Sequence, residues 1–184
     1  EASGTEGALP FLYLLAGSVS EPVSRQAARI DSMALRMFGP GYERFRPIEG
    51  WSLATWHASQ GHTGPLELLA GRMAERAEGD SVSAMISLLN TSLQGHLALA
   101  RSDTSAAIDR LSSLNPIYPS NKLNYGIREV LPYERLKLAE LLLAQNRFND
   151  ADEAAAVFDH PGPTIFLFFL RESLAVRAEA ALAM

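Results

Sequence analysis

The chain has 184 residues, of which 20% are charged, and a formal net charge of −5. Its 16 basic residues are spread along the chain, so we expect no extended basic face of the kind that displaces counterions from phosphate, and no nucleic-acid partner for this segment. The absence of Cys excludes disulfides, thiolate catalysis and thiolate metal sites.

The composition favours helices. Ala and Leu occur 27 times each, whereas the β-branched residues that strands prefer are scarce. The longest apolar stretch near the start, residues 8–16, is far shorter than the ~20 residues of a membrane-spanning helix. We therefore predict an all-α chain without a membrane span of its own, which leaves membership of a membrane-associated complex open.

The first elements in chain order are two helices. We expect a short apolar helix over residues 9–16, and then an amphipathic helix that has Ser20 as its cap and Pro22 in its first turn. Its apolar stripe has alternating spacings of four and three residues and consists of Val23, Ala27, Ile30, Ala34 and Met37. Residues 39–41 (Gly-Pro-Gly) should end it, and residues 42–49, which include Pro47, should form a connection.

The middle of the chain predicts four more helices and one long connection. We expect helices over residues 51–60, 63–77, 82–100 and 107–114, the second with Thr63 as its cap and Pro65 in its first turn. Residues 79–81 should break the chain between the second and third of these. Residues 115–130 contain Pro, Asn and Gly and should be irregular, and a connection of that length is often functional.

The last third predicts three helices. One should have Pro132 in its first turn and end near Gln145, and its partner should cover residues 148–158. Residues 160–163 (His-Pro-Gly-Pro) should stop the partner, and Thr164 should cap a final helix that reaches Met184.

Three turns repeat along the chain, centred on Gly61, Ser102 and Asn146, with separations of 41 and 44 residues. A small residue lies seven positions before each turn (Ala54, Gly95 and Ala139), and Leu66, Ala107 or Ala151 lies five positions after it. Antiparallel helices approach closely where one presents a small side chain, and such pairs must stack to bury their apolar faces.

At these residues the chain resembles the tetratricopeptide-repeat superfamily. The best match is residues 138–155, where Ala139, Asn146, Phe148 and Ala151 occupy the small, turn, aromatic and small positions. The spacing exceeds the ~34 residues of the family, and Thr63 and Thr104 replace its expected aromatic residue. The resemblance implies antiparallel helix pairs stacked as a short right-handed α-solenoid, similar to the helical-repeat regions of bacterial multidomain regulators.

This resemblance implies a division of the chain. Residues 1–49 should form N-terminal helices that pack on or cap the array, and residues 50–184 should form the repeats. Ala178 fits the small position of one more repeat, whose turn would fall just beyond Met184. We therefore expect the last repeat to be incomplete, either because the last helix caps the array or because the chain is a piece of a longer array.

The resemblance also implies partner-binding residues, because first helices line the concave groove of the family. One residue past the small positions, Thr55, His96 and Glu140 should face this groove, with Trp51 a weaker addition. Trp51 and Trp56 lie five residues apart, so we expect one in the core and allow the other as a binding anchor.

The segment 165–170 (Ile-Phe-Leu-Phe-Phe-Leu) is apolar around its whole circumference. Such a helix is either enclosed by its neighbours or uses one face to dock a partner. We favour burial, but Phe166 and Phe169 are the residues of this segment that a partner would contact.

No catalytic, cofactor or metal site is evident. The four His residues lack the spacing of zinc hydrolases, and a metal shared by His57 and His62 is a weak alternative. Asp150, Asp152 and Glu153 are better explained by the dipole at a helix start than by a cation site. Phosphate loops and nucleophile elbows are absent from the sequence.

The leading hypothesis is a non-catalytic scaffold that binds other protein chains, as an accessory subunit or part of a larger assembly. The alternative is a ligand- or peptide-sensing domain of a bacterial kinase or transcriptional activator. A helical enzyme is the third hypothesis, and it would need Glu140, His96 and Arg135 in one closed pocket. The sequence does not fix the compartment, and we favour the cytoplasm.

Overall fold

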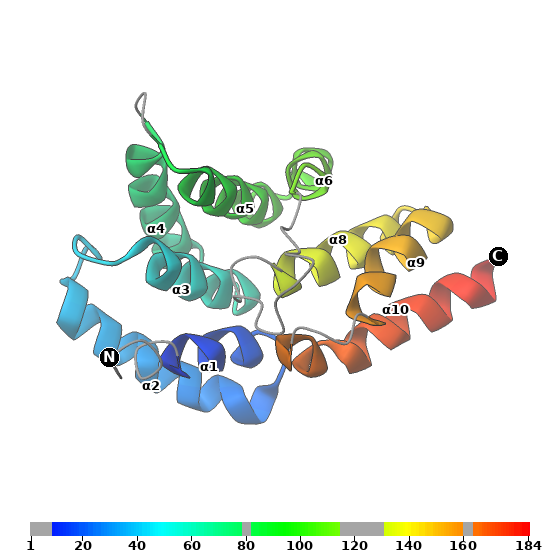
Figure 1. The fold of residues 1–184 in the computed structure, drawn as a ribbon, viewed down its shortest axis with the longest axis horizontal. Helices are drawn as coiled ribbons and strands as arrows, with labels where there is room; N and C mark the ends of the chain where they lie inside the picture. The colour runs from blue at the N-terminus through cyan, green and yellow to red at the C-terminus, as the bar shows by residue number, and fades with distance from the viewer. Residues whose placement is uncertain (1–8, 79–81, 115–130, 160–163) are drawn as a thin grey trace. The chain divides into compact units, whose positions relative to one another are not determined.

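The computed structural model describes residues 9–78, 82–114, 131–159 and 164–184, and all regular structure in these ranges is helical (Figure 1). This confirms the all-α prediction for the described part of the chain. The breaks expected at 79–81 and 160–163 and the connection expected at 115–130 lie outside the described residues. The α-helices are α1 (Leu9–Gly17), α2 (Glu21–Phe38), α3 (Pro47–Ser59), α4 (Thr63–Arg76), α5 (Ala84–Ala100), α6 (Thr104–Ser112), α8 (Pro132–Ala144), α9 (Phe148–Ala156) and α10 (Leu170–Ala183).

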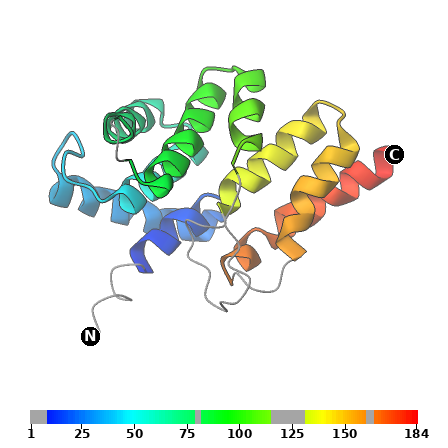
Figure 2. The same ribbon diagram turned by 45° about the horizontal axis from the view of Figure 1, so that its top comes forward.

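The chain divides into two compact units, Glu1–Asp103 and Thr104–Met184. In the first unit, α1 packs against α2 and α3, α3 packs against α4, and α5 packs against both α3 and α4 (Figure 2). The border therefore falls between Asp103 and Thr104, and the helices of residues 9–38 belong to the same unit as α3, α4 and α5.

In the second unit, α8 and α9 pack together, α10 packs against both, and α6 packs against α8. Arg177 links α10 to α9 and to the residues after it, because its guanidinium donates to Asp152 at 2.8 Å and to Asp159 at 2.6 Å. Phe158 packs edge-to-face on Phe166 and stacks on Phe169, with ring centroids 5.0 and 6.0 Å apart. The three phenylalanine rings thus form an aromatic cluster in the core of the second unit.

The three turns found in the sequence share one hydrogen-bonding motif. Gly61, Ser102 and Asn146 all adopt left-handed backbone conformations, with φ of 71°, 61° and 60°. In each case the next residue donates its backbone N–H to the carbonyl oxygen five residues earlier, at 2.9 Å. This is the Schellman motif, which satisfies the last carbonyl groups of a helix. The first turn joins α3 to α4 and the third joins α8 to α9.

The turn geometry predicts opposite effects for two glycine substitutions. A Cβ at Gly61 would meet nothing within 4 Å, so Gly61→Ala should cost only the left-handed backbone, about 1–2 kcal/mol of unfolding free energy. Gly71 lies inside α4 with equally open space, so Gly71→Ala should stabilise the protein by about 0.5–1 kcal/mol. Urea unfolding checks both, and a shift of the same sign in the two variants would contradict the turn geometry.

Some expected helix starts are wrong: α6 begins at Thr104, three residues before the expected start, and α4 has His62 and not Thr63 at its N-cap. The difference is larger at the start of α3. Pro47 does not lie in a connection but occupies the first turn of α3, where its missing N–H costs nothing. Glu49 accepts the backbone N–H of Arg46 at 2.8 Å and pairs with the Arg46 side chain, so the helix start is capped. The α3 helix is therefore one turn longer at its N-terminus than expected.

The final helix also differs from the expectation. Thr164 begins a 3₁₀ helix, η2 (Thr164–Phe168), and α10 follows from Leu170. Within the apolar run, Ile165, Phe166 and Phe169 are buried, whereas Leu167 is 71% and Phe168 50% exposed. The apolar segment therefore turns three of these side chains into the core and two toward the surface, and it is only partly enclosed by its neighbours.

Candidate functional site

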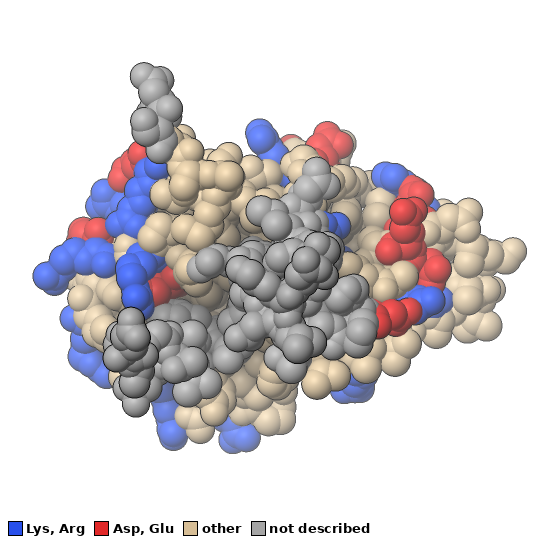
Figure 3. Space-filling view, in the orientation of Figure 1, with Lys and Arg blue, Asp and Glu red and all other residues tan. Residues whose placement is uncertain are grey.

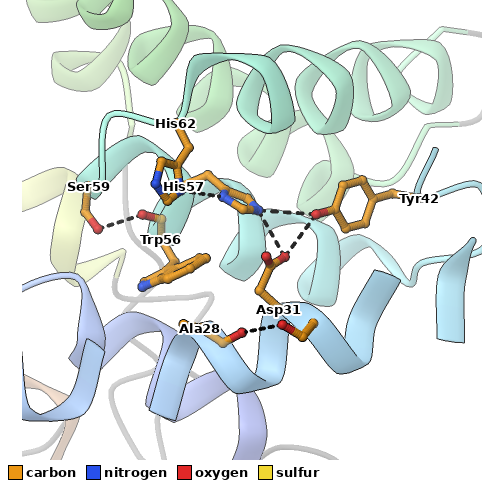
Figure 4. Close-up of polar contacts among 8 residues, drawn as sticks. Ala28, Asp31, Tyr42, Trp56, His57, Ser59 and His62 are labelled. Carbon is orange, nitrogen blue, oxygen red and sulfur yellow. Dashed lines mark hydrogen bonds and ion pairs between the residues drawn. The ribbon is translucent and has the colours of Figure 1, made fainter. Parts of the chain in front are cut away.

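The most developed polar cluster of the described residues lies in the first unit and involves Asp31, Tyr42, His57 and His62 (Figure 4). Asp31 comes from α2, Tyr42 from the loop after α2, His57 from α3, and His62 from the α3–α4 turn. Figure 4 shows the His57 ring between Asp31 and His62. Its side chain is only 3% exposed, whereas His62 lies at the surface.

The hydrogen-bond distances indicate which atoms of the cluster donate and which accept. The Tyr42 hydroxyl donates to Asp31 Oδ1 at 2.9 Å, and His57 Nε2 lies 3.1 Å from the same oxygen. An ionised carboxylate only accepts, so Nε2 carries the proton, and the Nδ1 of a neutral His57 accepts from His62 Nδ1, 3.3 Å away. The cluster therefore connects the exposed turn at His62 to the inner side of α2.

The loop that carries Tyr42 is held in place. Tyr42 has a left-handed backbone (φ 50°), a conformation that only surrounding contacts maintain for a bulky residue. Phe45 is buried against Gly50, where an added Cβ would come within 2.3 Å of the ring. Arg76 donates to the Phe45 carbonyl at 2.6 Å and lies over its ring. The Tyr42 hydroxyl is thus positioned by the packing of its own loop.

Electrostatics stabilise the charged form of Asp31. Burial raises the pKa of this carboxyl group, but the hydrogen bond from His57 and the charge that His57 carries when protonated, together with the Tyr42 hydroxyl and His62, lower the pKa by more. The net pKa lies below the ordinary value. Burial and the charge of Asp31 raise the pKa of the Tyr42 hydroxyl, which therefore stays a donor at neutral pH.

Asp31→Asn should remove an acid-sensitive contribution to stability. A carboxyl group with a lowered pKa stabilises the folded state above about pH 4, and the contribution is lost as the pH falls through the folded-state pKa. The substitution should therefore cost about 1–3 kcal/mol at pH 7 and less at pH 3, which lies below the unfolded-state pKa. Urea unfolding at both pH values checks this, with the exposed Asp109→Asn as control. Equal losses at the two pH values would contradict a role of the charge.

The described residues contain no group of three His, Asp or Glu side chains that could hold a metal ion. His57 and His62 do meet, as their spacing allowed, but through a hydrogen bond between their Nδ1 atoms. The hydrogen-bonded path from His62 through His57 to Asp31 could carry a proton. A contact that moves the His62 ring would also change the hydrogen bond between His57 and Asp31.

Three of the predicted groove residues lie in the first unit and are buried there. Trp51, Thr55 and His96 are at most 1% exposed. Trp51 of α3 donates its indole N–H to Ser92 of α5 at 3.0 Å, and His96 lies one turn further along α5. Trp56 is also buried, so both tryptophans belong to the core. A partner would reach these side chains only if the helices around them separated.

The other predicted residues lie in the second unit. Glu140 is half-buried and accepts from Lys137 at 2.6 Å, and Phe166 and Phe169 are brought together on Phe158. Arg135, the third member of the hypothetical enzyme trio, donates to the Leu114 carbonyl at 2.9 Å. His96 belongs to the first unit, so only Glu140 and Arg135 share one unit.

Sequence reasoning missed Asp31 and Tyr42. The signal for Asp31 was present, because this residue lies four positions after Ala27 and three before Ala34, on the buried side of an amphipathic helix. A carboxylate on that side needs a partner. Nothing local indicates that the partner is His57, which lies 26 residues later.

Comparisons with known proteins do not identify the chain. It matches no protein-family model, and neither a curated protein nor a solved structure shows significant similarity to it. Among the described helices, none is both long and apolar enough to cross a membrane.

Proposed function

We propose that the chain is a non-catalytic protein-interaction module whose helix hairpins stack as a short, right-handed array of the tetratricopeptide type. It serves as an accessory subunit or as part of a larger assembly. The hydrogen bond between Trp51 and Ser92 carries this proposal, because the two residues are 41 positions apart. That distance equals the separation of the turns at Gly61 and Ser102, so equivalent positions of α3 and α5 contact each other, as stacking in register requires.

Exposed apolar side chains support the interaction role. In the second unit, Leu174 and Leu182 of α10 are 49% and 89% exposed and lie on one side of the helix, with Ala178 between them. Leu167 and Phe168 add exposed apolar area in the segment before α10. Apolar side chains grouped on one surface mark binding sites more often than single ones do.

The proposed function predicts a stable complex with another protein. The tagged chain, purified from its native source under mild conditions, should elute with a mass well above the 20.0 kDa of the chain and with a second protein in stoichiometric amount. Size-exclusion chromatography with light scattering and mass spectrometry measure both. A chain that elutes alone as a monomer from its native source would overturn the proposal.

A regulatory domain that senses a ligand or peptide is the second candidate. The observation that favours it is the hydrogen-bonded path from exposed His62 through His57 to Asp31 on α2. A ligand that contacts His62 would change the bonding of α2. A ligand-dependent rise in melting temperature that disappears in His62→Ala would favour this candidate over the scaffold.

A further inference from the structure

The outward side of α2 carries arginines and methionines together. Arg25, Arg29 and Arg36 are exposed and follow each other at spacings of four and seven residues, so they form one row along the helix. Met33 and Met37 lie one turn apart beside this row and are 51% and 64% exposed. The opposite side of α2 is buried through Ala27, Ala34 and Phe38.

The charges of this row are not neutralised within the described residues. Arg25, Arg29 and Arg36 form no ion pair there, and Arg29 donates only to the amide oxygen of Gln26, at 3.3 Å. In the space-filling view, blue side chains border the molecule where Figure 1 places α2 (Figure 3). Arg72, Arg101, Arg147 and Arg177 are paired with carboxylates, whereas Arg110 and Arg171 also form no ion pair among the described residues but lie singly on other helices. The outward side of α2 is therefore a local basic surface on an acidic chain.

The residue types indicate the chemistry of the partner. A guanidinium group binds a carboxylate through two parallel hydrogen bonds, which gives it an advantage over Lys in protein interfaces. Exposed methionines are flexible and polarisable, and they adapt to apolar side chains of different shapes. The α2 helix has 18 residues, so it spans about 27 Å, enough for a partner helix of several turns.

Charge complementarity favours an acidic protein over other anionic partners. A membrane surface or a nucleic acid extends beyond α2 and would meet the rest of a chain whose net charge is −5. A short acidic segment seated over residues 25–37 would contact the three arginines and the two methionines. Glu21, one turn before Arg25, is the only exposed carboxylate of α2, so the segment would gain most of the attraction with little of the repulsion.

We propose that the outward side of α2 docks an acidic, amphipathic helical segment of a partner protein. Carboxylates of that segment pair with Arg25, Arg29 and Arg36, and its apolar side chains pack on Met33 and Met37. This inference rests on the proposed interaction function and adds the chemical class of the partner and the place where it binds.

The test uses a synthetic helical peptide with Glu on one side and Leu beside it, labelled for fluorescence anisotropy. The intact chain should bind this peptide, and binding should weaken as salt is raised. The triple variant R25E/R29E/R36E should weaken binding about tenfold or more, because each attraction becomes a repulsion. M33S/M37S should weaken binding severalfold while the salt dependence stays the same.

The matched control is R101E/R110E/R171E, which changes the net charge equally through three exposed arginines on other elements. It should leave peptide binding within about twofold of the unmodified chain. Circular dichroism and thermal unfolding establish that each variant folds, and R25Q/R29Q/R36Q replaces the charge-reversal variant if that one does not. If the two triple variants lost peptide affinity equally, the peptide would be attracted only by the total charge of the chain, and the proposal would be overturned.

Two further outcomes would overturn the proposed docking surface. One is that a scrambled peptide of the same composition binds as tightly as the helical peptide. The other is that the chain binds vesicles of phosphatidylcholine and phosphatidylserine, or a single-stranded oligonucleotide, more tightly than the helical peptide. The native complex separates this proposal from the proposed function. If the native partner copurifies equally with the α2 triple variant, the docking surface is wrong and the interaction function stands; if no partner copurifies with the unmodified chain, the interaction function itself fails.

Discussion

Trp51→Ala should lower the free energy of unfolding by about 3–5 kcal/mol, the largest loss we expect from a single substitution in this chain. The Trp51 side chain is completely buried, and its indole N–H donates to Ser92 Oγ at 3.0 Å. Its removal leaves a large cavity between α3 and α5 and also deletes that hydrogen bond. Urea unfolding followed by circular dichroism measures the loss.

A double-mutant cycle separates the hydrogen bond from the packing. Trp51→Phe, Ser92→Ala and the combination should reveal a coupling energy of about 0.5–1.5 kcal/mol. Trp56→Phe is the matched control, because Trp56 is also buried but its indole nitrogen has no hydrogen-bond partner among the described residues. If Trp51→Phe and Trp56→Phe cost the same and the coupling is zero, the contact between α3 and α5 does not contribute to stability as described.

Ala139→Leu should destabilise the second unit by about 1–3 kcal/mol. Ala139 is completely buried in α8, which packs against α6, α9 and α10, and a larger side chain must push neighbouring groups apart. Helix propensity is not the cause, because Leu forms helices nearly as well as Ala. The loss should appear as a lower urea midpoint at an unchanged slope.

Ala178→Leu is the control for this substitution. Ala178 occupies the corresponding small position of α10 by sequence register, but its side is exposed. Leu at this position should change stability by less than about 0.5 kcal/mol. A loss as large as that of Ala139→Leu would mean that α10 is covered in solution, and it would contradict the exposed surface described above.

Much of the fold was predictable because its determinants are local. The turns at Gly61, Ser102 and Asn146 depend on residues that tolerate a left-handed backbone, and the small residues Ala54 and Ala139 are completely buried. Both features can be recognised within one helix hairpin. The helix start at Pro47 was missed because Pro breaks a helix in its interior but favours its first turn, and the sequence does not state which applies.

The candidate site was less predictable because it depends on contacts between distant residues. Every residue from Glu49 to His57 is buried, so α3 has no single apolar stripe that would reveal its orientation. The repeat register therefore predicts a groove position for Trp51 and Thr55, although both are buried in the described structure. The partnership of Asp31 with His57 requires α2 and α3 to be placed first, which local patterns cannot do.

The local turns have a consequence for how the chain folds. Each joins helices that are neighbours in sequence, so little chain entropy is lost when α3 meets α4 or when α8 meets α9. Chains dominated by such short-range contacts fold in microseconds to milliseconds. During synthesis, α3 and α4 can pair and receive α5 before residues 104–184 have been translated, which shortens the time that the core around Trp51 is exposed to aggregation.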